Sequence, residues 1–268
     1  MRRKRIFAAM AGIMVCAAAC SGTKDNEEAP TGAAETGTVT DIDGNTYTTV
    51  KIGARWWMAE NLRTYRFRNG DEITRYPHEQ FAPASDNPVS STANRAGSTG
   101  GSKYDGVVHF AFPNNDSANV ATYGLGYTWF AAVDERGLCP EGWTLPDTGM
   151  WYELCLASGI GGRDRENPET WTDVAPALKT DSLWIRDSTS TSTVATNKLG
   201  FSIVPAGDLS AWGFAGFGAF ARFWTPSYVH HDSTGWGRRY MEFSYRHDDM
   251  WRGQYRSNSC ISIRCVKL

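Results

Sequence analysis

Alternating apolar and polar positions predict strands in several parts of the chain. Between residues 39 and 53 the alternation runs on both sides of Asp43-Gly44, a dipeptide typical of tight two-residue turns. We therefore expect a β-hairpin there, followed by a third, largely buried strand over residues 56–62. Shorter apolar or alternating runs predict further strands at 200–205, 220–225, 239–245 and 260–267.

Helical spacing of apolar residues is confined to short segments. It predicts one helix over residues 123–133 and a second one after Pro146. In the second, Asp147 is a good N-cap, and apolar residues recur behind it at Trp151, Leu154 and Cys155. Part of the segment 174–179 is expected to form a third helix.

Residues 66–120 have few periodic apolar positions and are rich in Ser, Asn, Gly and Pro. They predict long loops, with one or two short strands around residues 107–112. The expected fold class is therefore a loop-rich α+β domain with small antiparallel sheets and two to three short helices.

The first 20 residues have the pattern of a bacterial lipoprotein signal. A basic segment, Arg2 to Arg5, precedes an apolar run over residues 6–19 that is too short to span a membrane as a mature helix. Three alanines precede Cys20, as in a lipobox, although Leu is usual where Ala17 stands. We expect a signal peptide over residues 1–19 and lipidation of Cys20; the alternative is an ordinary secretory signal.

Residues 20–37 are polar and rich in small side chains, which predicts a disordered, lipid-anchored tether. Its acidic patch, ending at Glu27 and Glu28, resembles the surface-export signal of Bacteroidota lipoproteins. We expect a location in the outer membrane of a Gram-negative bacterium, exposed at the surface; a plain solvated linker is the alternative. Residues 38–268 are long enough for one core and contain no linker-like stretch.

The charge of the chain argues against one class of partner. Removal of residues 1–19 takes away four of the 27 basic residues, leaving 23 against 29 acidic ones, a net charge of −6. Phosphate binding requires basic patches, so nucleic acid is not an expected partner.

Four cysteines follow Cys20, and the expected compartment permits disulfides. On a strand, Cys260 and Cys265 would point to opposite faces and lie roughly 16 Å apart, which is beyond disulfide reach. Of the two pairings that remain, we favour Cys139–Cys265 together with Cys155–Cys260. Each would close a loop of more than 100 residues and stabilise the fold by roughly 4–5 kcal/mol.

Nine short motifs lie in order along the chain, at Asp41–Gly53, Trp57–Leu62, Asn114–Gly124, Tyr127–Ala132, Cys139–Pro146, Ala177–Lys179, Gly200–Gly207, Phe223–Ser227 and Ile263–Lys267. Together they resemble the Fibrobacter succinogenes major paralogous domain family over about residues 38–268. The resemblance implies a C-type-lectin-like fold, which formylglycine-generating enzymes share, and surface or secreted lipoproteins of unestablished function. The family's cysteines match Cys139 and Cys265, which makes Cys155–Cys260 an additional bridge. Residues 66–113 fit the family least.

Aromatic residues are concentrated near the C-terminal end of the sequence: thirteen of the 34 lie between Trp212 and Tyr255. Trp and Tyr rings can stack on sugars or peptide side chains. Most of these rings are expected in the core, but Trp236, Trp251 and Tyr255 have polar, Gly and Arg neighbours and are the candidate ligand-binding residues. We therefore expect a non-catalytic surface binding or adhesion module for a glycan or protein. We expect no cofactor; the calcium-binding triplets of C-type lectins are absent, so calcium-dependent sugar binding is not supported.

Two other chemistries are open. Cys260 and Cys265 have the spacing of the copper-binding cysteine pair of formylglycine-generating enzymes, so an oxidoreductase with copper is the alternative function; two disulfides would leave no thiol for it. The clusters His230-His231-Asp232 and His247-Asp248-Asp249 suggest a metal or hydrolytic site. Adjacent histidines rarely converge on one ion, so we expect solvated loops, with a hairpin turn at 248–249 and no metal.

Overall fold

The computed structural model describes residues 34–268 except 78–105, 189, 211–212, 232–234 and 257, and it does not describe the side chains of residues 229–236. Residues from Ala33 to Leu268 form one compact unit. The predicted signal peptide, Cys20 and most of the tether lie outside the described residues. Within the described part of the chain, no helix is long and apolar enough to cross a membrane.

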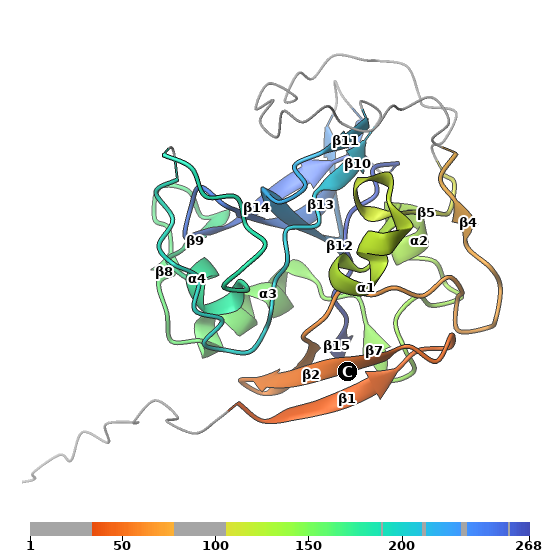
Figure 1. Ribbon diagram of the computed structural model, residues 1–268, viewed down its shortest axis with the longest axis horizontal. Helices are drawn as coiled ribbons and strands as arrows, with labels where there is room; N and C mark the ends of the chain where they lie inside the picture. The colour runs from red at the N-terminus through yellow and green to blue at the C-terminus, as the bar shows by residue number, and fades with distance from the viewer. Residues whose placement is uncertain (1–33, 78–105, 189, 211–212, 232–234, 257) are drawn as a thin grey trace, which may run out of the picture. The chain divides into compact units, whose positions relative to one another are not determined.

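The first of two five-stranded sheets has the order β1-β2-β3-β15-β7, and every pair in it is antiparallel. Its strands are β1 (Thr36–Thr40), β2 (Thr46–Ile52), β3 (Arg55–Met58), β15 (Val266–Lys267) and β7 (Trp143–Thr144). The predicted hairpin is confirmed, with Gly44 at φ +82° in its turn. The Asp41 carboxylate accepts the backbone N–H groups of Asp43 and Asn45 at 3.0 and 2.9 Å, which fixes the turn. Figure 1 shows β1 and β2 in orange beside β15 and β7.

The second sheet has the order β12-β13-β14-β9-β8 and is also antiparallel. Its strands are β12 (Phe220–His231), β13 (Gly235–Ser244), β14 (Met250–Tyr255), β9 (Thr170–Thr172) and β8 (Gly162–Arg163). The strand predicted at 220–225 lies within β12, and the one predicted at 239–245 overlaps β13, which ends at Ser244. An irregularity in the pairing between Trp224 and Tyr228 interrupts the register.

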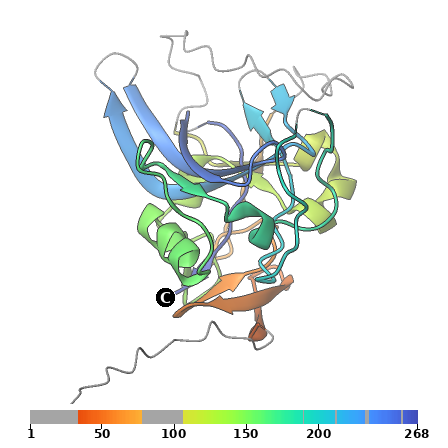
Figure 2. The same ribbon diagram turned by 90° about the vertical axis from the view of Figure 1, so that its left-hand side faces the viewer.

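The predicted helix after Pro146 is α3 (Thr148–Ala157), and the Asp147 side chain accepts the N–H of Met150 at 2.8 Å as its N-cap. Figure 2 shows this helix in green between the orange strands and the blue ones. Its buried residues share one core cluster with residues of both sheets. The Trp151 ring lies 5.2 Å from Trp57 of β3 and 5.3 Å from Phe223 of β12. This helix therefore joins the two sheets into one core.

Three sequence predictions need correction. Residues 123–133 do not form one helix but α1 (Val120–Tyr123), β6 (Gly126–Tyr127) and α2 (Trp129–Ala132). The break follows from Gly124, whose φ is +72° and where a Cβ would lie 2.5 Å from the Cβ of Asn61. Residues 200–205 form only a bridge from Ile203 to Lys179. Residues 260–262 are extended, but each pairs with a different segment, so the regular strand begins at Val266.

The remaining elements are short. They are β4 (Thr74–Arg75), β5 (His109–Ala111), α4 (Ala175–Leu178), β10 (Asp208–Ser210), β11 (Gly213–Ala215) and the 3₁₀ turns η1 (Pro113–Asn115) and η2 (Ser117–Asn119). The pair β4–β5 is parallel and the other small pairs are antiparallel. The fold is thus α+β with mostly small antiparallel sheets, and the described residues contain four short α-helices rather than two to three.

Candidate functional site

The cysteines are only partly paired as predicted. Cys139 and Cys265 form a disulfide with a Cα–Cα distance of 5.9 Å, which confirms that pairing. Cys155 and Cys260 are free and buried, so the predicted second bridge is wrong. The Cys155 thiol lies on the face of α3 that meets β14, with its Sγ 3.6 Å from the Sδ of Met250. Cys260 belongs to a separate small cluster around Leu209, and the two thiols therefore face different parts of the core.

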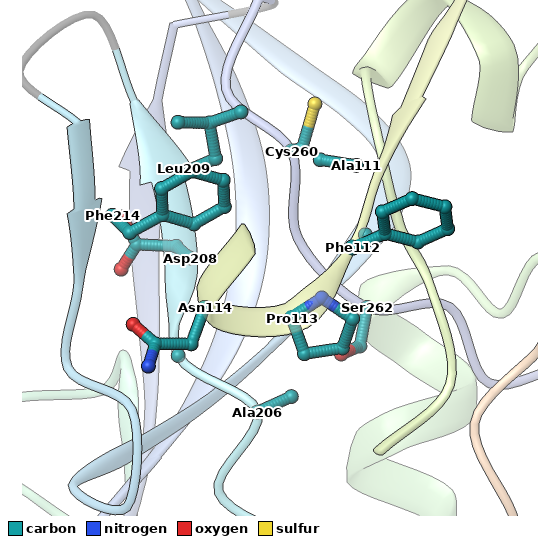
Figure 3. Close-up of a pocket in the computed structure, with 12 residues that line it drawn as sticks. Ala111, Phe112, Pro113, Asn114, Ala206, Asp208, Leu209, Phe214, Cys260 and Ser262 are labelled. Carbon is teal, nitrogen blue, oxygen red and sulfur yellow. The ribbon is translucent and has the colours of Figure 1, made fainter. Parts of the chain in front are cut away.

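The cavity beside Cys260 is small, and Figure 3 shows its walls. Its volume of about 20 Å³ is enough for roughly one water molecule. Burial raises the pKa of the Cys260 thiol, which opposes the thiolate form that binds metals. Cys265 is bonded to Cys139 and therefore cannot serve as the second ligand of a copper ion.

The His and Asp clusters do not converge on a metal in the part of the chain that the structure describes. There, no group of three or more His, Cys, Asp or Glu side chains lies together. Asp232 and the side chains of His230 and His231 lie outside the described residues. The predicted hairpin is formed by β13 and β14, which residues 245–249 connect, but its turn lies at residues 245–246, earlier than the predicted 248–249.

The three candidate aromatic residues have different surroundings. Trp251 of β14 is 41% exposed, and its ring stacks on His247 at 5.0 Å and 19°. Tyr255 is half-buried instead of exposed: its ring packs 5.2 Å from Tyr240, and burial raises its pKa to about 12. The backbone of Trp236 pairs with His230, but its side chain is not described. Of the three, only Trp251 is seen as an exposed platform.

Tyr255 belongs to a charged network on β10, β12 and β13. Its hydroxyl lies 3.2 Å from an Arg222 guanidinium nitrogen and 3.4 Å from an Asp208 carboxylate oxygen. Arg222 forms ion pairs with both Asp208 and Glu242. A buried cation that is satisfied by two carboxylates holds these strands together and leaves Tyr255 as a structural residue.

A larger cavity, of about 210 Å³, lies beside the β13–β14 turn. We call it the turn cavity. Its walls come from residues 179–187 and 190–195, and Tyr245 closes one side. The wall is tied to the turn through Asp248, whose carboxylate accepts the Ser192 hydroxyl at 2.6 Å and the Thr193 N–H at 2.9 Å. Hydrogen bonds to Asp248 therefore fix the loop that forms part of the cavity wall.

Lys179 is a buried cation in the wall of the turn cavity, with 2% of the residue exposed. Its ammonium group donates to the carbonyls of Ser244 at 2.6 Å and His247 at 2.9 Å, and approaches the Ser192 hydroxyl at 3.4 Å. It also lies 4.9 Å from the centroid of the Trp184 ring. Burial lowers the pKa of Lys179 to about 8, against the opposing effect of the nearby Asp248 and Asp249.

The aromatic walls of the cavity are held in place by hydrogen bonds. Trp184 Nε1 donates to the Ile203 carbonyl at 3.3 Å. The Tyr245 hydroxyl donates to Asp187 at 3.2 Å and accepts from Arg246 at 2.7 Å. Chemically, the arrangement offers ring surface, hydroxyls and backbone groups inside a fixed frame, which are the components of a site that recognises small polar molecules.

Sequence reasoning missed this cavity because it concentrated on residues 212–255. One signal was present: Lys179 follows the apolar run of α4 directly, and a hydroxyl-rich segment, residues 188–193, lies shortly after Trp184. A lysine at the end of an apolar run is common, however, so only the structure reveals that this one is buried.

The turn cavity and Trp251 are linked by one residue, His247. Its backbone carbonyl holds the Lys179 ammonium group on the cavity side, and its ring stacks on Trp251 at the surface. The β13–β14 turn therefore carries both a concave polar feature and an exposed aromatic one, and it is the candidate site of the molecule.

Comparison with known proteins supports the order of motifs along the chain. The model of the Fibrobacter succinogenes major domain matches residues 50–267. No curated protein and no solved structure matches the chain. The matched region spans most of the sequence, including the whole second five-stranded sheet and all of the first except β1 and the start of β2. The chain therefore belongs to the Fibrobacter succinogenes major domain family.

Proposed function

We propose that this chain is a lipid-anchored surface module of C-type-lectin-like fold that binds an extracellular glycan or protein without catalysing a reaction. The observation that carries the proposal is the candidate site itself, where the turn cavity and Trp251 lie on either side of one turn. An aromatic platform beside a cavity lined by hydrogen-bonding groups suits recognition of an amphipathic ligand.

The proposed location rests on the N-terminal sequence. A basic segment, an apolar run, three alanines and Cys20 favour lipidation, and the acidic residues after Cys20 favour export to the outer surface. We expect labelling of the protein in cells by an alkyne-bearing fatty acid, and loss of that label in Cys20→Ser. Retention of the label in Cys20→Ser would place the modification elsewhere.

Binding is tested with the purified protein on glycan arrays and against extracellular proteins from its own environment. For a ligand found in this way, Trp251→Ala should raise Kd by about tenfold, because the variant loses the exposed ring that would stack on the ligand. Tyr228→Ala is the matched control, since it removes another exposed aromatic ring, from β12 of the same sheet. Absence of any ligand in both screens would contradict the proposed function. Equal binding by folded wild type and Trp251→Ala would remove Trp251 from the site.

A further inference from the structure

We infer that the turn cavity binds a single neutral, hydroxyl-rich ring, such as the terminal unit of a neutral glycan, without a metal ion. The inference rests on the proposed function and narrows it to one ligand class and one site. Size, charge balance and the distribution of apolar and polar groups in the cavity each lead to it.

The volume limits the ligand to about one ring. Pockets that enclose drug-sized molecules have volumes of about 300–1,000 Å³, and the turn cavity has about 210 Å³. An extended oligosaccharide or a peptide helix would therefore have to leave most of its length outside. A terminal sugar unit could enter while the rest of the chain runs over the surface.

The four charged residues that line the cavity balance one another. Lys179 and Arg186 contribute two positive charges, and Asp181 and Asp187 contribute two negative ones. The Lys179 ammonium is already engaged by two carbonyls and a hydroxyl, and the Tyr245 hydroxyl donates to Asp187. The lining itself therefore has no net charge to select an acidic or a basic ligand, and a neutral one loses the least hydration on entry.

The lining combines apolar and polar surface, as a pyranose ring does. Trp184, Ile185 and Val194 supply apolar surface. The Thr193 hydroxyl supplies hydrogen-bonding capacity, and the Ser190 hydroxyl, which donates to the Tyr245 carbonyl at 2.7 Å, can still accept. A sugar ring has an apolar C–H face and a rim of hydroxyls, so it can satisfy both kinds of surface at once. A purely apolar ligand would leave the polar groups without partners.

The cavity is also preorganised. Asp248 holds Ser192 and Thr193, Ile203 holds the Trp184 ring, and Lys179 bridges the wall and the turn. Since these groups are fixed before binding, a small ligand with few contacts does not have to order them. For one sugar unit we expect Kd in the millimolar range.

The test is a titration of the purified protein, in buffer containing EDTA, with the methyl glycosides of glucose, galactose, mannose and N-acetylglucosamine. Glucuronate and glucosamine serve as charged comparisons, and saturation-transfer NMR reports binding. We expect at least one neutral glycoside to bind and Val194→Trp to weaken it by about tenfold or more. Val194 is 64% exposed at the cavity, so a larger ring there blocks entry without entering the core. Leu156→Trp adds the same ring at an exposed residue of α3 and should bind like the wild type.

Arg186→Trp, a second blocking variant on an exposed residue of the wall, covers the case in which Val194→Trp does not fold. Binding of the charged sugars alone, dependence on added calcium, or unchanged affinity in the folded blocking variants would overturn the inference. Such results leave the proposed function standing if the protein still binds an array glycan or an extracellular protein. A protein that binds no glycoside, no array glycan and no protein contradicts both.

Discussion

At the scale of single residues, two buried cations hold together segments that lack regular pairing. Lys179 joins the wall of the turn cavity to the β13–β14 turn. Arg264, fully buried, donates to the side-chain oxygen of Asn61 and to the carbonyls of Met58, Phe201 and Ser202. Both cations are satisfied mainly by neutral oxygens, which is why burial lowers the pKa of Lys179 to about 8 and that of Arg264 to about 9.

Lys179 should make the stability of the fold depend on pH. Its pKa is about 8 in the folded state and about 10.5 when unfolded, so between these values the unfolded chain binds more protons and the free energy of unfolding rises with pH. Burial of the charged lysine lowers the free energy of unfolding by up to ~3 kcal/mol. This loss is greatest below pH 8 and is absent above the unfolded pKa. Chemical denaturation of wild type and Lys179→Met between pH 7.5 and 9.5 should show about 2 kcal/mol of it, because tyrosine and cysteine titration is common to both. Parallel stability curves for the two proteins would contradict the prediction.

Arg264→Lys should lower the free energy of unfolding by about 3 kcal/mol, although it preserves the charge. A lysine ammonium group cannot reproduce the fork of donors that meets four acceptors, and an acceptor left without a partner in the core is costly. Urea denaturation gives the change, with Arg165→Lys as the matched control because Arg165 is exposed. If both variants unfold at the same urea concentration, the four hydrogen bonds of Arg264 contribute little.

At the scale of elements, the disulfide joins the approach to β7 to the approach to β15, two neighbours in the first sheet. It encloses a sequence separation of 126 residues, for which loop-closure entropy predicts roughly 4–5 kcal/mol of stabilisation. The other two described cysteines are buried and form no disulfide.

Alkylation with peptide mapping should separate these cysteines into two groups. Cys155 and Cys260 should react only after unfolding, without reductant, because burial raises the pKa of both thiols and shields them. Cys139 and Cys265 should react only after reduction. Recovery of a peptide that links Cys155 to Cys260 would restore the pairing that the sequence suggested.

Elements with a strong local cause were predictable. The Asp43-Gly44 turn and the Asp147 cap each act within a few residues, and both elements formed as expected. The helix over residues 123–133 failed because Gly124 packs against Asn61, a residue 63 positions away in the sequence. The Cys155–Cys260 pairing failed for a similar reason: helical period identifies the buried face of α3 but not which strand covers it.

At the scale of the whole molecule, the order of motifs predicted the family correctly because nine weak signals in register rarely coincide. The turn cavity could not be predicted in the same way, because its wall residues, Tyr245 and Asp248 come together only after α4 and the β13–β14 turn have formed. The same is true of Tyr255, whose polar neighbours in sequence suggested exposure but whose ring packs beside Tyr240 and Arg222. Sites built from distant loops leave little trace in local pattern.

The position of β15 between β3 and β7 has a consequence for the order of events during synthesis. Every other strand of that sheet is made earlier, so until Val266 leaves the ribosome the half-formed sheet has an open slot with unpaired backbone groups on both sides. Cys139 likewise has no disulfide partner until Cys265, 126 residues later in the sequence, has been made. A growing chain of this kind therefore remains open to wrong pairing until β15 has been made.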